Sequence, residues 1–317
     1  MRYKTFGNTG MRVSEMALGT WGIGGAGWDD RPEETRLDAI RAAVELGVNF
    51  IDTAPAYNAG AAEKLVGRAI RDIGCRDKVF IATKCGNEFI GGQYVRCGRP
   101  ENILRECDES LENLQTDYID LYLIHWPDEN VPFSDTMGAI NRLREEGKVR
   151  HVGVSNFSRE QIERAGQYCP IEAVQVQYSM VARDNEPLMK WAAGQGMGVM
   201  TYGSLGGGIL SGAIRQARTY DPMDSRSRFY KHFQEPMFSR IMELLKVMDG
   251  LSAAREGTPL SQIALNWSAQ KDFVSTCIVG AQSRPRVAEN AAAFGWSLRA
   301  EETAALDGAI AKYLDGE

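Results

Sequence analysis

Eight short apolar runs alternate with segments of helical periodicity along this chain, and that alternation restricts the fold more than any other feature. The runs predict strands at residues 16–20, 49–54, 79–85, 118–126, 149–156, 173–179, 198–205 and 276–281. Helical spacing follows them, as in 61–73 and 134–147, and Ser158 with Gln161 forms a capping-box sequence. Eight strand–helix units fit a closed parallel barrel better than a six-stranded doubly wound sheet. We therefore predict an α/β fold of the (β/α)8 TIM barrel type.

Three segments extend this barrel. Residues 3–14 have the pattern of a hairpin with its turn at 7–10, which would close the bottom of the barrel. Long polar loops are expected at 86–99 and 206–235, after the third and seventh strands, on the face where barrel enzymes bind substrate. The first helix is expected to begin near Asp30 and to end at Gly47. No linker divides the chain, so residues 1–317 are expected to form one domain.

Charge and cysteine content exclude several classes of function. A net charge of -6 and a pI near 5.4 argue against a nucleic-acid surface, which needs a concentrated basic patch. No apolar stretch approaches the length of a membrane span, and the N-terminus lacks the apolar segment of a signal peptide. The six cysteines are widely spaced, with no metal-ligand rhythm. We expect reduced thiols in a cytoplasmic protein without a metal site.

Residues 22–27 match the dinucleotide-binding pattern G-x-G-x-x-G and follow a predicted strand. In a Rossmann unit a helix begins inside that motif, and an acidic residue follows about twenty positions later. Here residues 28–32 separate the motif from the helix, and the next strand ends too far away, at Asp52. We interpret the motif as a flexible glycine-rich loop.

Four polar residues stand at or near the ends of predicted strands. Asp52, Lys84 and His125 end three of the runs, and Tyr57 lies in the loop after the first of these. If the three strands are neighbours, all four side chains gather at one rim, where together they would suit proton delivery. Taken singly, a strand-end Asp or His can be a structural residue. Lys84 alone would also suit a Schiff-base aldolase.

Several segments resemble signatures of the aldo-keto reductases. Residues 47–57 (GVNFIDTAPAY) closely resemble the first of these, and 121–127 (LYLIHWP), 153–157 (GVSNF), 175–178 (QVQY) and the sequence up to Glu289 and Asn290 follow in family order. The matches cover nearly the whole chain, and the predicted barrel is the fold of the family. The chain resembles a bacterial branch that includes inositol-catabolism-associated reductases and aldose dehydrogenases. The resemblance implies an NAD(P)H-dependent oxidoreductase that interconverts an aldehyde, ketone or aldose and its alcohol.

By position, the resemblance assigns catalytic roles to the same four residues. Tyr57 would protonate the carbonyl oxygen during reduction, or act as the base in reverse. Lys84 would lower the pKa of Tyr57, which is ordinarily near 10. Asp52 would hold the Lys84 ammonium and offset the cost of burying it. His125 would hydrogen-bond and orient the carbonyl, and could share in proton relay.

The resemblance also implies a site for the nicotinamide cofactor. Ser155, Asn156 and Gln177 would hold the carboxamide, and Tyr202 would stack on the ring. Glycines in 203–208 would let backbone N–H groups approach the pyrophosphate. The full set of expected cofactor residues is Thr20, Trp21, Asp52, Ser155, Asn156, Gln177, Tyr202, Gly203, Leu205, Gly207, Gly280, Gln282, Arg286, Glu289 and Asn290.

The adenosine end departs from a common pattern of the family. Relatives often have a lysine or arginine where Gln282 stands, a cation suited to a 2′-phosphate. Arg284 and Arg286 would compensate, with Arg286 contacting the phosphate or stacking on adenine and Asn290 bonding the adenine. The sequence therefore favours NADP, with NAD left possible.

The substrate is expected to be a small carbonyl compound, sugar or polyol, and the oligomeric state is left open. The side chains expected to contact it are Trp21, Tyr57, Asn87, Phe89, His125 and Trp126. An alternative function is a cofactor-binding regulatory or sensor protein with little turnover, since the family includes channel-associated members. A complete set of catalytic residues disfavours that alternative.

Overall fold

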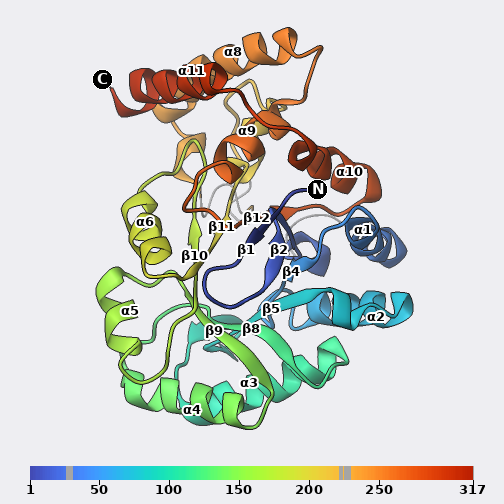
Figure 1. Cartoon of the computed structure of the whole chain (residues 1–317), viewed down its shortest axis with the longest axis vertical. Coiled ribbons are helices and arrows are strands. Elements are labelled where there is room, and N and C mark those ends of the chain that lie inside the picture. The colour runs from blue at the N-terminus through green and yellow to red at the C-terminus, as the bar shows by residue number, and fades with distance from the viewer. Residues whose placement is uncertain (26–30, 221–223, 225–229, 317) are drawn as a thin grey trace.

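The computed structural model describes residues 1–25, 31–220, 224 and 230–316. In these residues eight parallel strands close into a barrel, in the order β3-β4-β5-β8-β9-β10-β11-β12 (Figure 1). The TIM barrel prediction is therefore confirmed. The strands are β3 (Met16–Gly19), β4 (Phe50–Asp52), β5 (Phe80–Cys85), β8 (Ile119–Ile124), β9 (Val149–Ser155), β10 (Ala173–Gln177), β11 (Gly198–Tyr202) and β12 (Thr276–Gly280).

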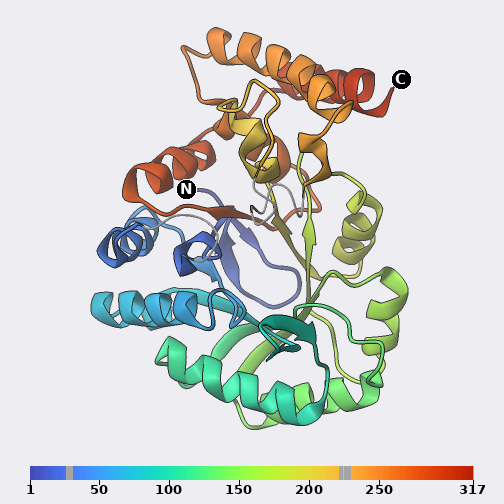
Figure 2. The same ribbon diagram turned by 180° about the vertical axis from the view of Figure 1, so that it is seen from behind.

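Helices surround the barrel on its outside, as both views down the molecule show (Figures 1 and 2). The helices of this ring are α1 (Glu33–Glu45), α2 (Ala61–Ile73), α3 (Pro100–Leu114), α4 (Phe133–Glu145), α5 (Arg159–Ala165), α6 (Glu186–Gly194), α9 (Leu260–Ala269) and α10 (Arg284–Ala292). Helices α8 (Met237–Ala254) and α11 (Ala300–Ile310) lie side by side beyond the ring. The predicted capping box is present, because Ser158 and Gln161 bond reciprocally at the start of α5.

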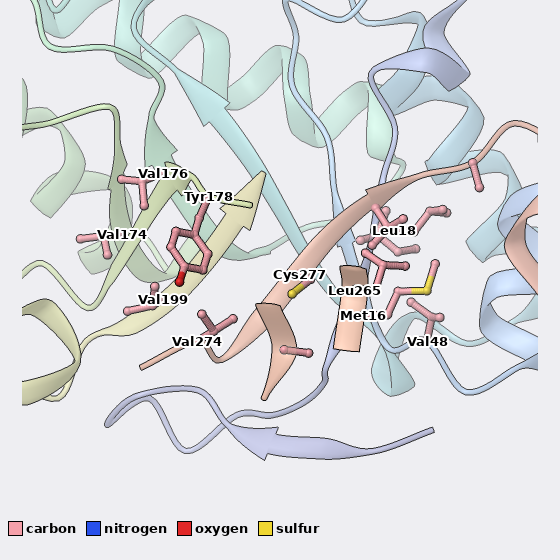
Figure 3. Close-up of a cluster of buried hydrophobic side chains, with 14 of the residues drawn as sticks. Met16, Leu18, Val48, Val174, Val176, Tyr178, Val199, Leu265, Val274 and Cys277 are labelled. Carbon is pink, nitrogen blue, oxygen red and sulfur yellow. The ribbon is translucent and has the colours of Figure 1, made fainter. Parts of the chain in front are cut away.

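Two apolar layers hold the barrel together. One lies between strands and helices, where Met16 and Leu18 of β3 and Leu265 of α9 are buried (Figure 3). The other fills the interior, because alternate strand residues such as Ala17 point inward. Burial on both faces explains why the strands read as nearly continuous apolar runs.

The N-terminal hairpin closes one end of the barrel, as predicted. Its strands β1 (Tyr3–Thr5) and β2 (Arg12–Ser14) pair antiparallel, and Phe6 between them meets Phe50 of β4 edge to face at 5.3 Å between ring centroids. Gly7 has a φ of 52°, and a Cβ there would lie 2.4 Å from the backbone nitrogen of Gly198. The turn of the N-terminal hairpin therefore requires glycine at position 7.

The polar segment predicted at 86–99 does follow the third barrel strand, but its middle folds as a second hairpin and not as an irregular loop. Strands β6 (Asn87–Ile90) and β7 (Gln93–Arg96) pair antiparallel across Gly91 and Gly92, both with positive φ. Paired glycines are typical of a two-residue hairpin turn, so the sequence did contain a signal for it.

Other segments are short helical turns. The glycine-rich motif contains η1 (Gly22–Gly24), and the loop predicted at 206–235 contains η3 (Gly206–Ser211) and η4 (Lys231–Phe233). The remaining turns are η2 (Arg76–Lys78), η5 (Ala293–Gly295) and η6 (Ala311–Asp315). Asp30, predicted to begin the first helix, residues 26–27 of the glycine motif and residues 221–223 and 225–229 lie outside the described residues. Among the described helices, none is long and apolar enough to cross a membrane.

Candidate active site

The four polar residues singled out in the sequence do meet at one rim of the barrel. Asp52 ends β4, Lys84 lies near the end of neighbouring β5, His125 follows β8, and Tyr57 lies in the loop after β4. Lys84 Nζ is 2.9 Å from both carboxylate oxygens of Asp52, 2.8 Å from the Thr53 carbonyl and 3.1 Å from the Tyr57 hydroxyl. A single ammonium thus links the aspartate to the tyrosine.

Lys84 remains charged although it is fully buried. Burial alone would lower its pKa, but the ion pair with Asp52 and the contact with Tyr57 outweigh burial and raise the pKa. A Schiff-base lysine must lose its proton before it can attack a carbonyl. The aldolase alternative is therefore disfavoured.

The hydroxyl of Tyr57 differs from the sequence-based expectation. Removal from water raises the pKa of Tyr57 above its ordinary value, and the Lys84 cation offsets only part of that rise. The predicted lowering of the Tyr57 pKa by Lys84 is present, but burial, which the sequence did not reveal, outweighs it. The phenol is therefore protonated at neutral pH and is able to donate its proton.

His125 stands across from Tyr57, with ring centroids 6.2 Å apart and the rings nearly perpendicular. Burial and the nearby Lys84 cation lower the pKa of His125 to about 3. The imidazole is therefore neutral near pH 7. It can donate one hydrogen bond, but it does not supply a proton as an imidazolium.

Gln175 is a further member of the cluster that the sequence did not single out. It lies inside the barrel on β10, and its Nε2 donates to Asp52 Oδ1 at 2.7 Å. Asp52 is thus fixed from two sides, by Lys84 and by Gln175. Gln175 begins the 175–178 segment that resembles a family signature. It also lies two residues before Gln177, and this period of two places both on the inward face of one strand.

The residues predicted to hold the nicotinamide carboxamide lie together beside His125. Asn156 Nδ2 donates to the His125 carbonyl and to Ser155 Oγ, both at 3.0 Å, and Asn156 Oδ1 accepts from the Tyr202 hydroxyl at 2.9 Å. Asn156, Gln177 and Tyr202 also line a cavity of about 500 Å³. This cavity extends to Trp126, which was predicted to contact substrate.

The predicted pyrophosphate segment follows β11 directly. Gly203 and Gly207 have φ values of 68° and 64°, and Leu205 lies between them. A Cβ on Gly207 would lie 2.9 Å from the Tyr230 ring. Glycine is therefore required here, which leaves the backbone N–H groups of the loop free of side-chain obstruction.

The predicted adenosine segment begins at Gly280, the exposed end of β12, and continues through α10. Gln282 Nε2 donates to the Gly22 carbonyl at 2.7 Å. Arg284 is bonded to two carboxylates of α1, Asp38 at 2.8 Å and Glu45 at 2.6 Å. The expectation that Arg284 compensates for Gln282 stays a prediction, since its guanidinium is engaged by two acids in this structure.

Arg286 and Asn290 are the adenosine-end residues that remain suited to a ligand. Arg286 is exposed, and within the described residues its ion pair is with Glu289 of its own helix, at 2.9 Å. Asn290 is fully buried, and neither atom of its amide has a hydrogen-bond partner in the described residues. An unpaired buried amide is costly, so Asn290 fits a position that a ligand completes.

The remaining predicted contacts surround the opening of the site. Thr20 Oγ1 donates to the Asp52 carbonyl at 3.0 Å, and Trp21 stacks near Tyr57 with 6.4 Å between centroids. Asn87 reaches His125 from the hairpin β6–β7. Phe89 is on the same hairpin, 63% exposed and packed on Tyr94.

Comparison with known proteins agrees with this geometry. Residues 15–311 match the model of the aldo/keto reductase family. The chain is 35% identical to the aldo-keto reductase YhdN of Bacillus subtilis, over 95% of this chain and 91% of the relative. It is 33% identical to an NADH-specific methylglyoxal reductase of Escherichia coli, over 94% and 95%. The solved glycerol dehydrogenase of Gluconobacter oxydans superposes with a TM-score of 0.88 at 32% identity, over 96% of this chain and 93% of that one.

Proposed function

The chain belongs to the aldo/keto reductase family, and on that premise we propose that Tyr57, Lys84, Asp52 and His125 perform its carbonyl–alcohol oxidoreduction. The observation that supports this assignment most strongly is the buried Lys84 ammonium, which contacts Asp52 at 2.9 Å and the Tyr57 hydroxyl at 3.1 Å. A tyrosine proton donor held against a cation is suited to proton transfer to a carbonyl, and the named relatives are oxidoreductases.

In the reduction direction, Tyr57 is the general acid. Its hydroxyl proton goes to the carbonyl oxygen as negative charge develops there, and the Lys84 cation stabilises the phenolate that remains. Asp52, held by Gln175, keeps the ammonium pointing at the hydroxyl. Neutral His125 donates a hydrogen bond to the same oxygen and orients it.

The residues at the rim fit a nicotinamide dinucleotide. Ser155, Asn156 and Gln177 suit a carboxamide, and the glycines after β11 suit a pyrophosphate. Asn290, whose amide has no partner in the described residues, suits adenine. When bound, the reduced nicotinamide supplies the hydride that adds to the carbonyl carbon.

We assign the preferred cofactor as NADP, with Arg286 as the contact for the 2′-phosphate. Arg286 is exposed, and its partner Glu289 is three residues away on the same helix, so exchange of that partner costs little. Arg284 would have to give up two carboxylate partners on α1 to take this role, whereas Arg286 would give up one. NAD remains the competing cofactor, because one relative is NADH-specific by name.

For the substrate we propose a short carbonyl compound with neighbouring oxygen atoms, such as a 2-oxoaldehyde, a triose or an aldose. The relatives named for methylglyoxal and glycerol support this class. The cavity next to the predicted carboxamide residues extends to the aromatic wall of Trp126, and Ser158, Arg159 and Asn185 add polar side chains to its lining. Aromatic walls with a few polar groups suit a polyhydroxylated substrate. The free, buried state of all six cysteines, each in the described residues, supports a reducing, cytoplasmic location.

The test is a matrix of two cofactors and four substrates. The purified chain is mixed with NADPH or NADH and with methylglyoxal, glyceraldehyde, an aldose or benzaldehyde, and the absorbance of reduced cofactor is followed. We expect turnover with at least one oxygenated substrate and a higher kcat/KM with NADPH. Binding of NADPH without turnover of any carbonyl would refute the enzymatic assignment in favour of the regulatory one. A higher kcat/KM with NADH would refute the cofactor assignment alone.

A further inference from the structure

Asn87 reaches from the first position of β6 to the ring of His125. Asn87 Nδ2 lies 3.1 Å from His125 Nδ1, on the side of the imidazole that faces the hairpin. An amide nitrogen has hydrogens to donate and no acceptor capacity. The Nδ1 atom of His125 is therefore the acceptor in this pair.

The acceptor role of Nδ1 determines where the single proton of the ring resides. A neutral imidazole has one N–H and one bare nitrogen, and His125 is neutral because its pKa lies at about 3. A bare Nδ1 places the proton on Nε2. Within the described part of the chain, Nε2 of His125 makes no hydrogen bond to another side chain. The Nε2–H group is thus available to a ligand oxygen.

We propose that Asn87 is a positioning residue that holds His125 in its Nε2–H tautomer and so presents that hydrogen to the substrate carbonyl. This inference rests on the proposed function for what the hydrogen does, but the tautomer itself is a property of the protein alone. The other tautomer would turn a lone pair towards the carbonyl oxygen, and two acceptors repel.

The backbone around Asn87 is anchored firmly enough for this role. Glu106 of α3 accepts from the N–H groups of Gly86, at 2.7 Å, and Asn87. Asn102 Nδ2 donates to the Cys97 carbonyl at 3.0 Å and to Glu106 at 2.9 Å. Helix α3 therefore bonds to the chain at both ends of the hairpin, just before β6 and just after β7. Both Asn102 and Glu106 are buried, which protects these bonds from water.

The two other histidines provide internal references for the two tautomers. His232 Nε2 lies 2.9 Å from the Gly206 carbonyl, an acceptor, so His232 has its proton on Nε2. His151 Nδ1 lies 2.8 Å from a Glu172 carboxylate oxygen, so His151 has its proton on Nδ1. The chain contains 3 histidines in total, so each ring gives a separable signal.

The test is ring-¹⁵N spectroscopy of histidine-labelled protein at mildly alkaline pH, with no cofactor or substrate added. Protonated and bare ring nitrogens differ widely in ¹⁵N shift, so the tautomer is read directly. We expect His125 to show the pattern of His232. A His125 signal with the pattern of His151 would overturn the inference, and this comparison needs no variant.

Asn87→Asp tests whether Asn87 is the cause. A carboxylate only accepts, so His125 should change to the Nδ1–H pattern while the signals of His151 and His232 stay in place. Gln93→Glu is the matched control, because it adds the same charge to an exposed position of the same hairpin and should leave His125 unchanged. An unchanged His125 tautomer in Asn87→Asp would overturn the role of Asn87.

Kinetics separate this inference from the proposed function. The kcat of Asn87→Asp for carbonyl reduction should fall about a hundredfold, since loss of one oxyanion donor has that size of effect, with the Kd for NADPH unchanged. Wild-type protein with the Nε2–H pattern but no reductase activity would refute the proposed function and support the tautomer. Active wild-type protein with the Nδ1–H pattern would refute the tautomer inference and support the proposed function.

Discussion

Replacement of Lys84 by methionine tests how the ion pair at the rim contributes to stability and to chemistry. Lys84 is fully buried and Asp52 is 2% exposed, so Lys84→Met leaves a buried carboxylate with Gln175 as its remaining side-chain donor. Breaking a buried ion pair from one side costs about 3–5 kcal/mol. For a chain of 317 residues the unfolding entropy is about 0.7 kcal/mol per kelvin, so Tm should fall by about 4–7 °C.

The assay is a thermal melt followed by circular dichroism, without cofactor, because a bound ligand would stabilise the folded state. Lys148→Met is the matched control, since Lys148 pairs with Asp108 at the surface and such pairs contribute about 0–1 kcal/mol. The double variant Asp52→Asn with Lys84→Met removes the uncompensated carboxylate charge but keeps an amide oxygen as the acceptor for Gln175. It should regain most of the lost Tm and remain inactive.

Two results would refute this reasoning. A Tm of Lys84→Met equal to that of Lys148→Met would mean that loss of Lys84 does not leave an uncompensated charge on the buried Asp52 carboxylate. A double variant no more stable than Lys84→Met would mean that the loss comes from packing around residue 84, and not from an uncompensated charge.

Three further predictions address the remaining groups. Because the pKa of Tyr57 is raised, its phenolate fraction grows about tenfold per pH unit below that pKa. Steady-state alcohol oxidation should therefore accelerate with pH from about 7 to 9 while carbonyl reduction does not, and a flat oxidation profile would contradict Tyr57 as the base. Gln175→Leu should lower stability by about 1–3 kcal/mol in a denaturant titration, since it removes a charge-assisted bond to Asp52; an unchanged midpoint would exclude that bond as a stabilising contact. Arg286→Ala should raise the Kd for NADPH but not for NADH in fluorescence titrations, whereas Arg284→Ala should change neither; equal weakening of both cofactors by Arg286→Ala would remove Arg286 from phosphate binding.

The sequence predicted the rim of the site because its determinants are local. An apolar strand followed by a polar residue is readable without tertiary structure, and parallel strands place such residues at one edge, as for Asp52, Lys84 and His125. The hairpin at 87–96 was missed because the apolar residues of its strands do not alternate with polar ones, although the paired glycines of its turn did signal it.

Contacts between distant segments were not predictable in this way. Gln175 meets Asp52 only because the barrel closes, and Arg284 meets Asp38 only because α10 returns beside α1. The net pKa of Tyr57 depends on how much water surrounds its hydroxyl, which is a property of the folded rim. Residue types and strand ends therefore predicted which groups meet at the rim, but not how each is partnered.

The measurement that tests the central claim most directly is single-turnover reduction by Tyr57→Phe, with the Kd for NADPH measured on the same sample. The surface substitution Tyr168→Phe is the control, because it removes the same hydroxyl from a side chain that is 49% exposed. If Tyr57 is the proton donor, Tyr57→Phe should bind NADPH normally and reduce the carbonyl about 10²–10⁴-fold more slowly. A single-turnover rate equal to that of Tyr168→Phe would contradict the assignment of Tyr57 as the acid.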